Sequence, residues 1–291
     1  MINILSLFTL AALWGGSFLF VRIAANPLGP AVLIETRVAF AALTLLVVSF
    51  FLKKSLHFMS NIKHFLILGL FNSALPFLLF AYSAQILNVS TLAILNSTAP
   101  IWGAIIGAVW TRTWLTKEVV FGLVLGMIGV SVLVGWEAIN VGDEAIIPMI
   151  AALMGAFSYG VATNYAKNAP SVEPFNNAHG SMWASVILVL PLVPFMPVRE
   201  VVSVDIVFAV FALGAVCTGL AYLLYFRLIK ELGASSALTV TFIIPVFGIL
   251  WGYLFLGETV GINAIIGTVL VVTGTMFVTG FASRLISKNR V

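Results

Sequence analysis

Ten apolar stretches, each close to twenty residues long, occupy almost the whole chain. An α-helix rises about 1.5 Å per residue, so about twenty residues cross the roughly 30 Å of hydrocarbon in a bilayer. Only 8% of the 291 residues are charged, against about a quarter in soluble domains, so a water-facing surface could not be covered. The chain is therefore predicted to be an all-α membrane protein with ten transmembrane helices, at residues 3–24, 30–52, 63–83, 90–110, 117–136, 144–166, 175–194, 205–230, 236–256 and 261–282.

Basic residues are divided unequally between the two sides of these helices. With both termini in the cytoplasm, eleven of the 14 Lys and Arg residues face inward, Arg22 and Arg199 lie outside, and Arg37 lies within a span. The Lys/Arg bias sets membrane orientation, so we expect a multi-pass protein of the cytoplasmic (inner) membrane with both termini inside. The net charge of +4 does not indicate a nucleic-acid partner, because no basic run exceeds Lys53-Lys54.

An internal repeat appears when the chain is compared with itself at an offset of 145 residues. Over the 62 positions from 68 to 129 five glycines coincide, whereas the 24 glycines in 291 residues would give about 0.4 by chance. A second block, at an offset of 140, aligns Leu13-Trp14-Gly15 with Leu153-Met154-Gly155. The chain is thus predicted to hold two five-helix repeats, residues 1–140 and 141–291.

An odd number of spans in each repeat means that the second repeat begins on the opposite side of the membrane. The repeats are then inverted, an arrangement common in secondary transporters, where the two halves exchange conformations around a midplane site. This pattern favours alternating access; a duplication that merely gives a stable bundle is the alternative.

Several motifs resemble one known family, the drug/metabolite transporter superfamily and specifically its EamA-like ten-helix members. The resemblance covers nearly the whole chain and rests on Ala12–Phe18 with Arg22, Thr36–Phe40, the pattern from Ala93 through Pro100 to Gly129, and Gly233–Ala237 leading through Pro245 to Leu256–Thr259 and Gly267. It implies a duplicated five-helix unit and the export or exchange of metabolites, amino acids, nucleotide-linked compounds or toxic amphiphiles. The first repeat departs from it at Trp110–Thr113, which argues against a symmetrical role for Glu258.

Two spans carry proline and glycine near their middle, where a substrate cavity is expected. Proline removes a backbone hydrogen bond and glycine eases bending, so Pro100, Pro245, Gly103 and Gly248 are predicted hinge residues. Asn96 and Thr241 lie on the same helical faces and are predicted to bind substrate. Close helix packing through GxxxG spacing is the competing interpretation of the glycines.

Aromatic residues deep in the spans are further candidates for substrate binding, because a hydroxyl or indole N–H in hydrocarbon needs a partner. The candidates are Trp14, Trp102, Tyr159, Tyr222, Tyr225 and Trp251. Filling of the core or contact with lipid is the alternative for each. Arg37 is an ionisable residue inside a span and matches an arginine common in the resembled family; it would either orient an anionic group or brace neighbouring helices.

An enzyme is not expected, because the sequence lacks HExxH, EF-hand and P-loop patterns and shows no nucleophile with a suitably placed base. A passive solute channel remains the alternative to a transporter. We expect no cofactor and no metal site; the expected partners are a small-molecule substrate and the lipid bilayer, with a homodimer left open. An amino acid is the leading candidate for the substrate, and export is favoured through the family resemblance alone.

Overall fold

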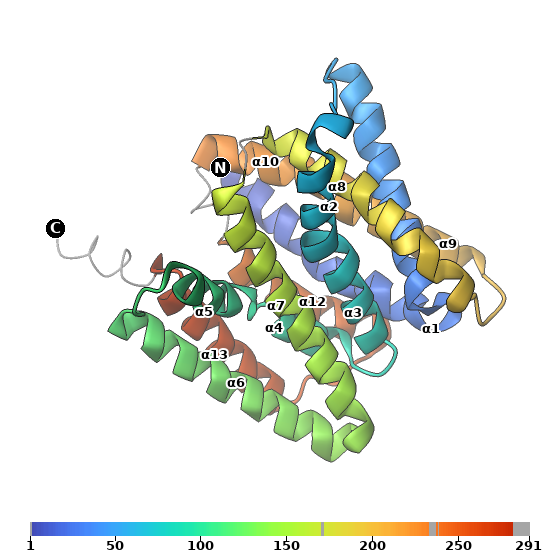
Figure 1. Cartoon of the computed structure of the whole chain (residues 1–291). Helices are drawn as coiled ribbons and strands as arrows, with labels where there is room; N and C mark the ends of the chain where they lie inside the picture. Colours follow the sequence, from blue (N-terminus) through green and yellow to red (C-terminus); the bar gives the residue numbers. More distant parts are fainter. Residues whose placement is uncertain (1, 170–171, 233–236, 238, 282–291) are drawn as a thin grey trace.

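A computed structural model describes residues 2–169, 172–232, 237 and 239–281, with the backbone alone for residues 2 and 134–141. All regular structure in this part of the chain is helical, as predicted (Figure 1). The α-helices are α1 (Ile2–Phe51), α2 (Ile62–Gly69), α3 (Leu75–Ser83), α4 (Val89–Asn96), α5 (Ala99–Thr111), α6 (Lys117–Val141), α7 (Ile146–Asn168), α8 (Pro174–Val189), α9 (Val204–Phe211), α10 (Ala221–Leu232), α12 (Val240–Leu256) and α13 (Ile262–Val278). Shorter 3₁₀ or π segments are η1 (Met59–Asn61), η2 (Leu70–Ala74), η3 (Asp143–Ala145), η4 (Leu190–Phe195) and η5 (Ala212–Leu220).

Among the described residues, six helical segments are long and apolar enough to cross a membrane, namely Asn3–Phe51, Met59–Ser83, Val89–Thr111, Asp143–Asn168, Pro174–Phe195 and Val204–Leu232. The helices Val240–Leu256 and Ile262–Val278 are apolar but shorter, at 17 residues each. These segments agree with a multi-pass membrane protein, while the count of ten spans stays a prediction. Most of the Gly233–Ala237 motif and the basic residues Arg284, Lys288 and Arg290 lie outside the described residues.

The first two predicted spans form the single long element α1, which changes direction at Gly29. This glycine has φ 70° and ψ 159°, a backbone conformation that residues with a side chain rarely adopt, and it separates the two helical arms of α1. Pro27 and Pro30 flank the bend. The backbone N–H groups of Arg199 and Glu200 both donate to the carbonyl of Pro27, so the connection before α9 holds the bend in place.

The predicted span 90–110 is broken rather than kinked. α4 ends at Asn96, and α5 begins at Ala99 with Pro100 as its second residue. The hydroxyl of Thr275 on α13 donates to the carbonyl of Ser97 over 3.1 Å, which satisfies a carbonyl freed by the break. The hydrogen-bond partner of this freed carbonyl is therefore a protein side chain.

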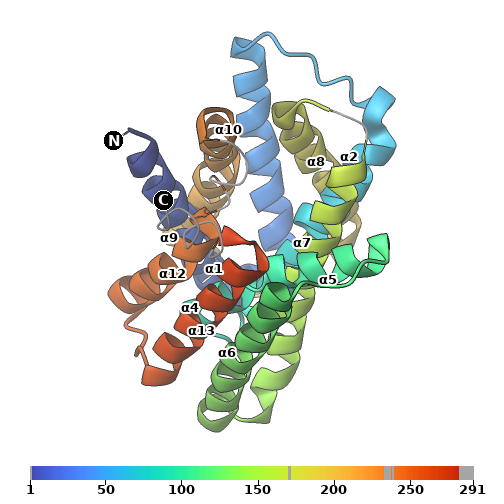
Figure 2. The same cartoon turned by 90° about the vertical axis from the view of Figure 1, so that its left-hand side faces the viewer.

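Helices α6 and α13, which the repeat makes equivalent, pack against each other through glycines (Figures 1 and 2). A Cβ at Gly122 would lie 2.5 Å from the carbonyl oxygen of Gly274, and one at Gly274 would lie 2.5 Å from the carbonyl oxygen of Gly122. Further along, Gly129 packs beside Val271, and a Cβ at Gly267 would lie 3.2 Å from the Gly129 carbonyl. As residue numbers rise along α6 they fall along α13, so equivalent helices run antiparallel.

Two more glycine contacts repeat between the halves. Gly15 on α1 approaches Gly248 on α12, and a Cβ at Gly15 would lie 3.0 Å from the Gly248 nitrogen. In the same way, a Cβ at Gly160 on α7 would lie 2.9 Å from the nitrogen of Gly103 on α5. The structural equivalent of Gly15 is therefore Gly160, at the offset of 145. The predicted alignment of Gly15 with Gly155, at an offset of 140, is wrong in this respect.

Helix ends follow the same offset. α5 ends at Thr111 and α12 at Leu256, and the next residues, Arg112 and Gly257, both have the left-handed conformation, with φ 54° and 63°. The π-helical segment η2 corresponds to residues 215–219, which lie within the π-helical segment η5. Local backbone irregularities thus recur where the repeat predicts.

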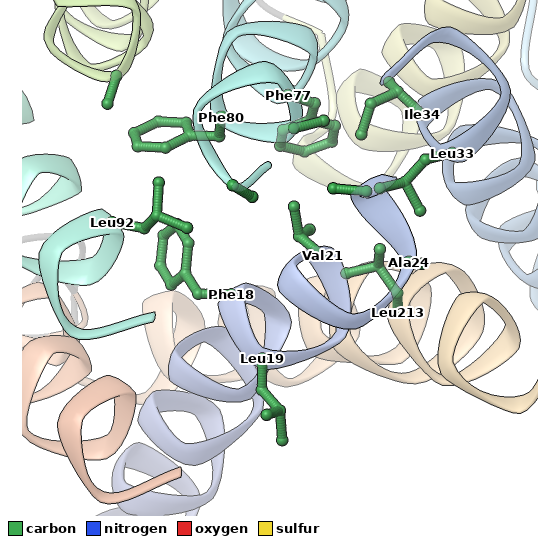
Figure 3. Packing of buried hydrophobic residues seen from close by; sticks show 14 of the residues in the cluster. Phe18, Leu19, Val21, Ala24, Leu33, Ile34, Phe77, Phe80, Leu92 and Leu213 are labelled. Atoms are coloured by element: carbon green, nitrogen blue, oxygen red, sulfur yellow. The ribbon is translucent and has the colours of Figure 1, made fainter. Parts of the chain in front are cut away.

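The largest core cluster joins α1 to α3, α4 and η5. Figure 3 shows Phe77 and Phe80 of α3 beside the side chains of α1, and the rings of Phe18 and Phe80 lie 5.6 Å apart in an edge-to-face arrangement. The core therefore mixes residues from both predicted repeats.

Candidate functional site

Five of the predicted site residues, carried by α1, α7 and α10, lie near one another. The ring of Trp14 lies 5.2 Å from that of Tyr225 and 6.5 Å from that of Tyr222. Arg37 is close enough to Tyr159 and Tyr222 to interact with both electrostatically. We call Trp14, Arg37, Tyr159, Tyr222 and Tyr225 the central cluster.

Arg37 is the charged member of the central cluster and is 7% exposed. Its Nε donates to the Thr218 hydroxyl over 3.1 Å, and its guanidinium carbon lies 3.6 Å from the centroid of the Phe77 ring. The backbone of Arg37 packs against Gly214, where a Cβ would lie 2.7 Å from the Arg37 carbonyl oxygen. This close approach, which only glycine allows, sets α1 against η5 and so places the arginine.

Aromatic rings in the central cluster are arranged in equivalent pairs. At the offset of 145, Trp14 corresponds to Tyr159 and Tyr225 to Phe80. The contact of Trp14 with Tyr225 at 5.2 Å accordingly has a counterpart in the contact of Tyr159 with Phe80 at 6.4 Å. The cluster is therefore built from matching positions of both halves.

Sequence reasoning missed four residues of this site, namely Asn72, Ser73, Phe77 as a partner of the arginine, and Thr218. Asn72 Nδ2 donates to the Tyr222 hydroxyl over 3.3 Å, and the fully buried Ser73 lies beside the same hydroxyl. The internal repeat could have indicated these residues, because at the offset of 145 Ser73 corresponds to Thr218 and Phe77 to Tyr222. These pairs lie on or next to the π-helical segments, which are frequent at functional sites.

Trp251 and Trp102 lie outside the central cluster. Trp251 Nε1 donates to the carbonyl of Ala12 over 3.0 Å, which holds α12 against α1. Trp102 contacts Phe157 edge to face at 5.6 Å, and its buried Nε1 has no hydrogen-bond partner among the described residues. The first tryptophan has a structural contact, and the second has an unused donor between α5 and α7.

The remaining predicted residues lie on α4, α5 and α12. Asn96 is the last residue of α4, and Thr241 is half-buried near the start of α12. A Cβ at Gly248 would lie 2.4 Å from Ala93 Cβ, so this glycine serves close packing of α12 on α4; at Gly103 the nearest atom would be 4.0 Å away. Pro100 begins a helix while Pro245 lies inside one, so the two predicted hinges differ.

Polar side chains at the other end of α4 secure the fold. The Glu258 carboxylate accepts the backbone N–H of Val89 over 2.8 Å and that of Ser90 over 3.4 Å, a favourable position for a negative charge at a helix N-terminus. Arg22 donates to the carbonyls of Ala84 and Gln85 over 2.6 and 2.8 Å. Both charged groups therefore have protein partners that explain their presence.

Chemically, the central cluster offers one cation, three phenol hydroxyls and several ring faces. Such a set can bind a small solute that combines an anionic or polar group with an apolar body. The described residues hold no group of three or more His, Cys, Asp or Glu side chains suited to a metal ion.

Comparison with known proteins shows the family of the chain. The EamA-like transporter family matches the chain twice, at residues 1–135 and 146–280. The chain belongs to the EamA-like transporter family. Family membership points to a transporter rather than an enzyme, and to a membrane-embedded chain.

Curated relatives of this EamA-like chain carry transporter names without a stated substrate. The uncharacterized transporter YoaV of Bacillus subtilis (strain 168) is 22% identical over 286 residues, covering 96% of this chain and 97% of the relative. An uncharacterized transporter in the trpA 3′ region of Buchnera aphidicola subsp. Schlechtendalia chinensis is 28% identical over 266 residues, covering 89% and 87%. An uncharacterized transporter of Archaeoglobus fulgidus is 25% identical over 266 residues, covering 91% and 94%.

A protein chain of known crystal structure has the same fold. It aligns with a TM-score of 0.67 and 19% identity, covering 97% of this chain and 98% of its own length.

Proposed function

We propose that this EamA-like protein is a secondary transporter of small organic solutes that works by alternating access between two inverted five-helix halves. The observation that carries the proposal is the antiparallel packing of the equivalent helices α6 and α13. The contact of Gly122 with Gly274 becomes the contact of Gly267 with Gly129 when the halves are exchanged. This relation supports a two-fold axis perpendicular to the helices, which in a membrane-spanning bundle would lie in the membrane plane.

The central cluster is the proposed substrate site. It lies between the halves and contains equivalent residues from each, so a rocking of one half against the other would alter access to it from either side. The single cation and the many rings favour a zwitterionic or amphiphilic solute, and an amino acid is the leading candidate. Export from the cytoplasm is proposed on the family resemblance.

Transport in proteoliposomes tests the function. Purified protein is reconstituted and supplied with each labelled amino acid, with and without a pH gradient, against protein-free liposomes. A transporter gives saturable uptake that unlabelled amino acid on the opposite side accelerates, because a loaded carrier changes its access faster than an empty one, a step that a pore does not have. Flux that neither saturates nor responds to trans substrate would indicate the channel instead, and no flux for any amino acid would reject the proposed substrate class.

Orientation is proposed from the basic residues, and the structure supplies two positions that test it. The ion pair of Lys54 with Glu173 joins the loop after α1 to the start of α8 at one end of the bundle, whereas Arg199 and Gln85 meet at the other. With Cys217 replaced, a cysteine at exposed Ser55 is expected to be shielded from an impermeant thiol reagent in intact cells, and one at exposed Asp143 to react. Labelling at Ser55 from outside would contradict the proposed orientation.

A further inference from the structure

We propose that Arg37 binds a carboxylate of the transported solute, so that the protein selects organic acids and zwitterions over neutral or cationic analogues. This inference rests on the proposed function, because it names the substrate class of the same central cluster.

The first observation is that Arg37 is a buried cation without a counter-ion among the residues that the structure describes. It is 7% exposed, and the ion pairs in the described part of the chain are those of Lys54 with Glu173 and of Arg227 with Glu231. An arginine keeps its charge inside a protein, and a charge at membrane depth costs several kcal/mol unless it is paired. A bound carboxylate would supply the missing charge.

The second observation is that the two terminal nitrogens of the Arg37 guanidinium have no hydrogen-bond partner among the described residues. The Phe77 ring centroid lies 3.6 Å from the guanidinium carbon. The bond from Nε to Thr218 is the one hydrogen bond that the guanidinium makes to the described residues. Both terminal nitrogens therefore keep their donors. Two parallel N–H groups are the arrangement that binds a carboxylate bidentately.

The third observation separates this role from that of a brace. Arg22 and Arg199 are arginines with such a structural role. The Nη1 of Arg22 donates to the carbonyls of Ala84 and Gln85, and the Nη1 of the exposed Arg199 donates to Gln85 Oε1 at 2.5 Å. Arg37 shows no such bond from either Nη within the described residues. A residue placed only to join helices would use these donors as the other two do.

The fourth observation is the position of Arg37 relative to the repeat. Its guanidinium contacts Phe77 and interacts with Tyr222, two residues at equivalent positions of the two halves. The glycine that packs on the Arg37 backbone, Gly214, corresponds to Gly69, which packs on Ser181. By this glycine contact Ser181, one position before the offset of 145, takes the place of Arg37 in the other half. The central cluster therefore has a single anion receptor rather than a symmetrical pair.

Binding to the detergent-purified full chain tests the proposal without requiring transport. The probes are L-leucine, L-methionine and L-phenylalanine, each compared with its carboxamide, which keeps the side chain and ammonium but removes the negative charge. Thermal stabilisation at increasing probe concentration gives apparent affinities for the wild type, R37Q, R37K and R199Q. The last variant removes an exposed arginine outside the central cluster and is the matched control.

We expect at least one acid to stabilise the wild type while its amide does so about 10- to 100-fold less effectively, because a charge-assisted bidentate bond is lost. R37Q should lose this preference, R37K should keep part of it, and R199Q should retain it fully. Equal stabilisation by acid and amide, no stabilisation by any acid, or an R37Q protein that melts earlier yet keeps the preference would overturn the proposal. Acid-selective binding without flux in proteoliposomes would instead reject the proposed function alone, and equal flux of acid and amide would reject this inference alone.

Discussion

Alanine at Gly274 is expected to lower the thermal stability of the purified protein by several degrees. Its Cβ would lie 2.5 Å from the Gly122 carbonyl oxygen and 2.7 Å from the Gly126 nitrogen, both backbone atoms that cannot move aside cheaply. Small residues let helix backbones approach in membranes, and forced overpacking costs about 1–3 kcal/mol, occasionally more. The measurement is the unfolding temperature in detergent.

The internal repeat leads to a second expectation about the contact between α6 and α13. G122A should destabilise the protein to a similar extent, since its Cβ would meet the Gly274 carbonyl oxygen at the same 2.5 Å. G103A is the matched control, because a Cβ there finds its nearest atom 4.0 Å away. Wild-type stability of G274A and G122A would contradict the close crossing on which the inverted arrangement rests.

Hydropathy predicted where helices lie because burial in lipid depends on the average of about twenty residues. The same averaging hid the break between α4 and α5, since residues 89–111 are apolar on average even though Asn96, Ser97 and Thr98 lie at the break. Ser97 and Thr98 donate their hydroxyls to the carbonyls of Ile94 and Leu95 over 2.7 and 2.6 Å, and Thr275 reaches the Ser97 carbonyl from α13. The first two bonds are local, but the bond from Thr275 depends on a neighbour distant in sequence, which periodicity does not reveal.

The candidate site was predictable in its rare residues and not in its common ones. Arg37 was identifiable because a charge inside a span is costly, and Trp14, Tyr159, Tyr222 and Tyr225 because they carry polar groups at depth. Phe77 is one of 23 phenylalanines, so nothing local marks it as the ring against the guanidinium. The alignment of Gly15 with Gly155 rested on a match of a few residues, which is weak evidence in an apolar chain. The helix contacts show instead that Gly160 occupies the equivalent position.

Replacement of Pro245 by alanine is expected to stabilise the protein and slow transport. Pro245 lies inside α12 and has no N–H to donate to the preceding turn, so alanine restores a helical hydrogen bond, worth up to about 3 kcal/mol in a helix interior. If about 1.4 kcal/mol of this stiffening opposes the bending of α12 during the access change, turnover falls about tenfold. Unfolding temperature and the rate of counterflow in proteoliposomes are the two measurements.

P100A is the control that the structure provides. Pro100 is the second residue of α5, a position whose N–H is not used within the helix, and the break before it is held by Ser97, Thr98 and Thr275. Alanine there should leave both stability and turnover nearly unchanged, although the sequence assigned the two prolines equal roles. Equal slowing by P100A and P245A would show that both halves bend at their prolines, whereas wild-type turnover in P245A and in the double variant would reject a hinge at either position.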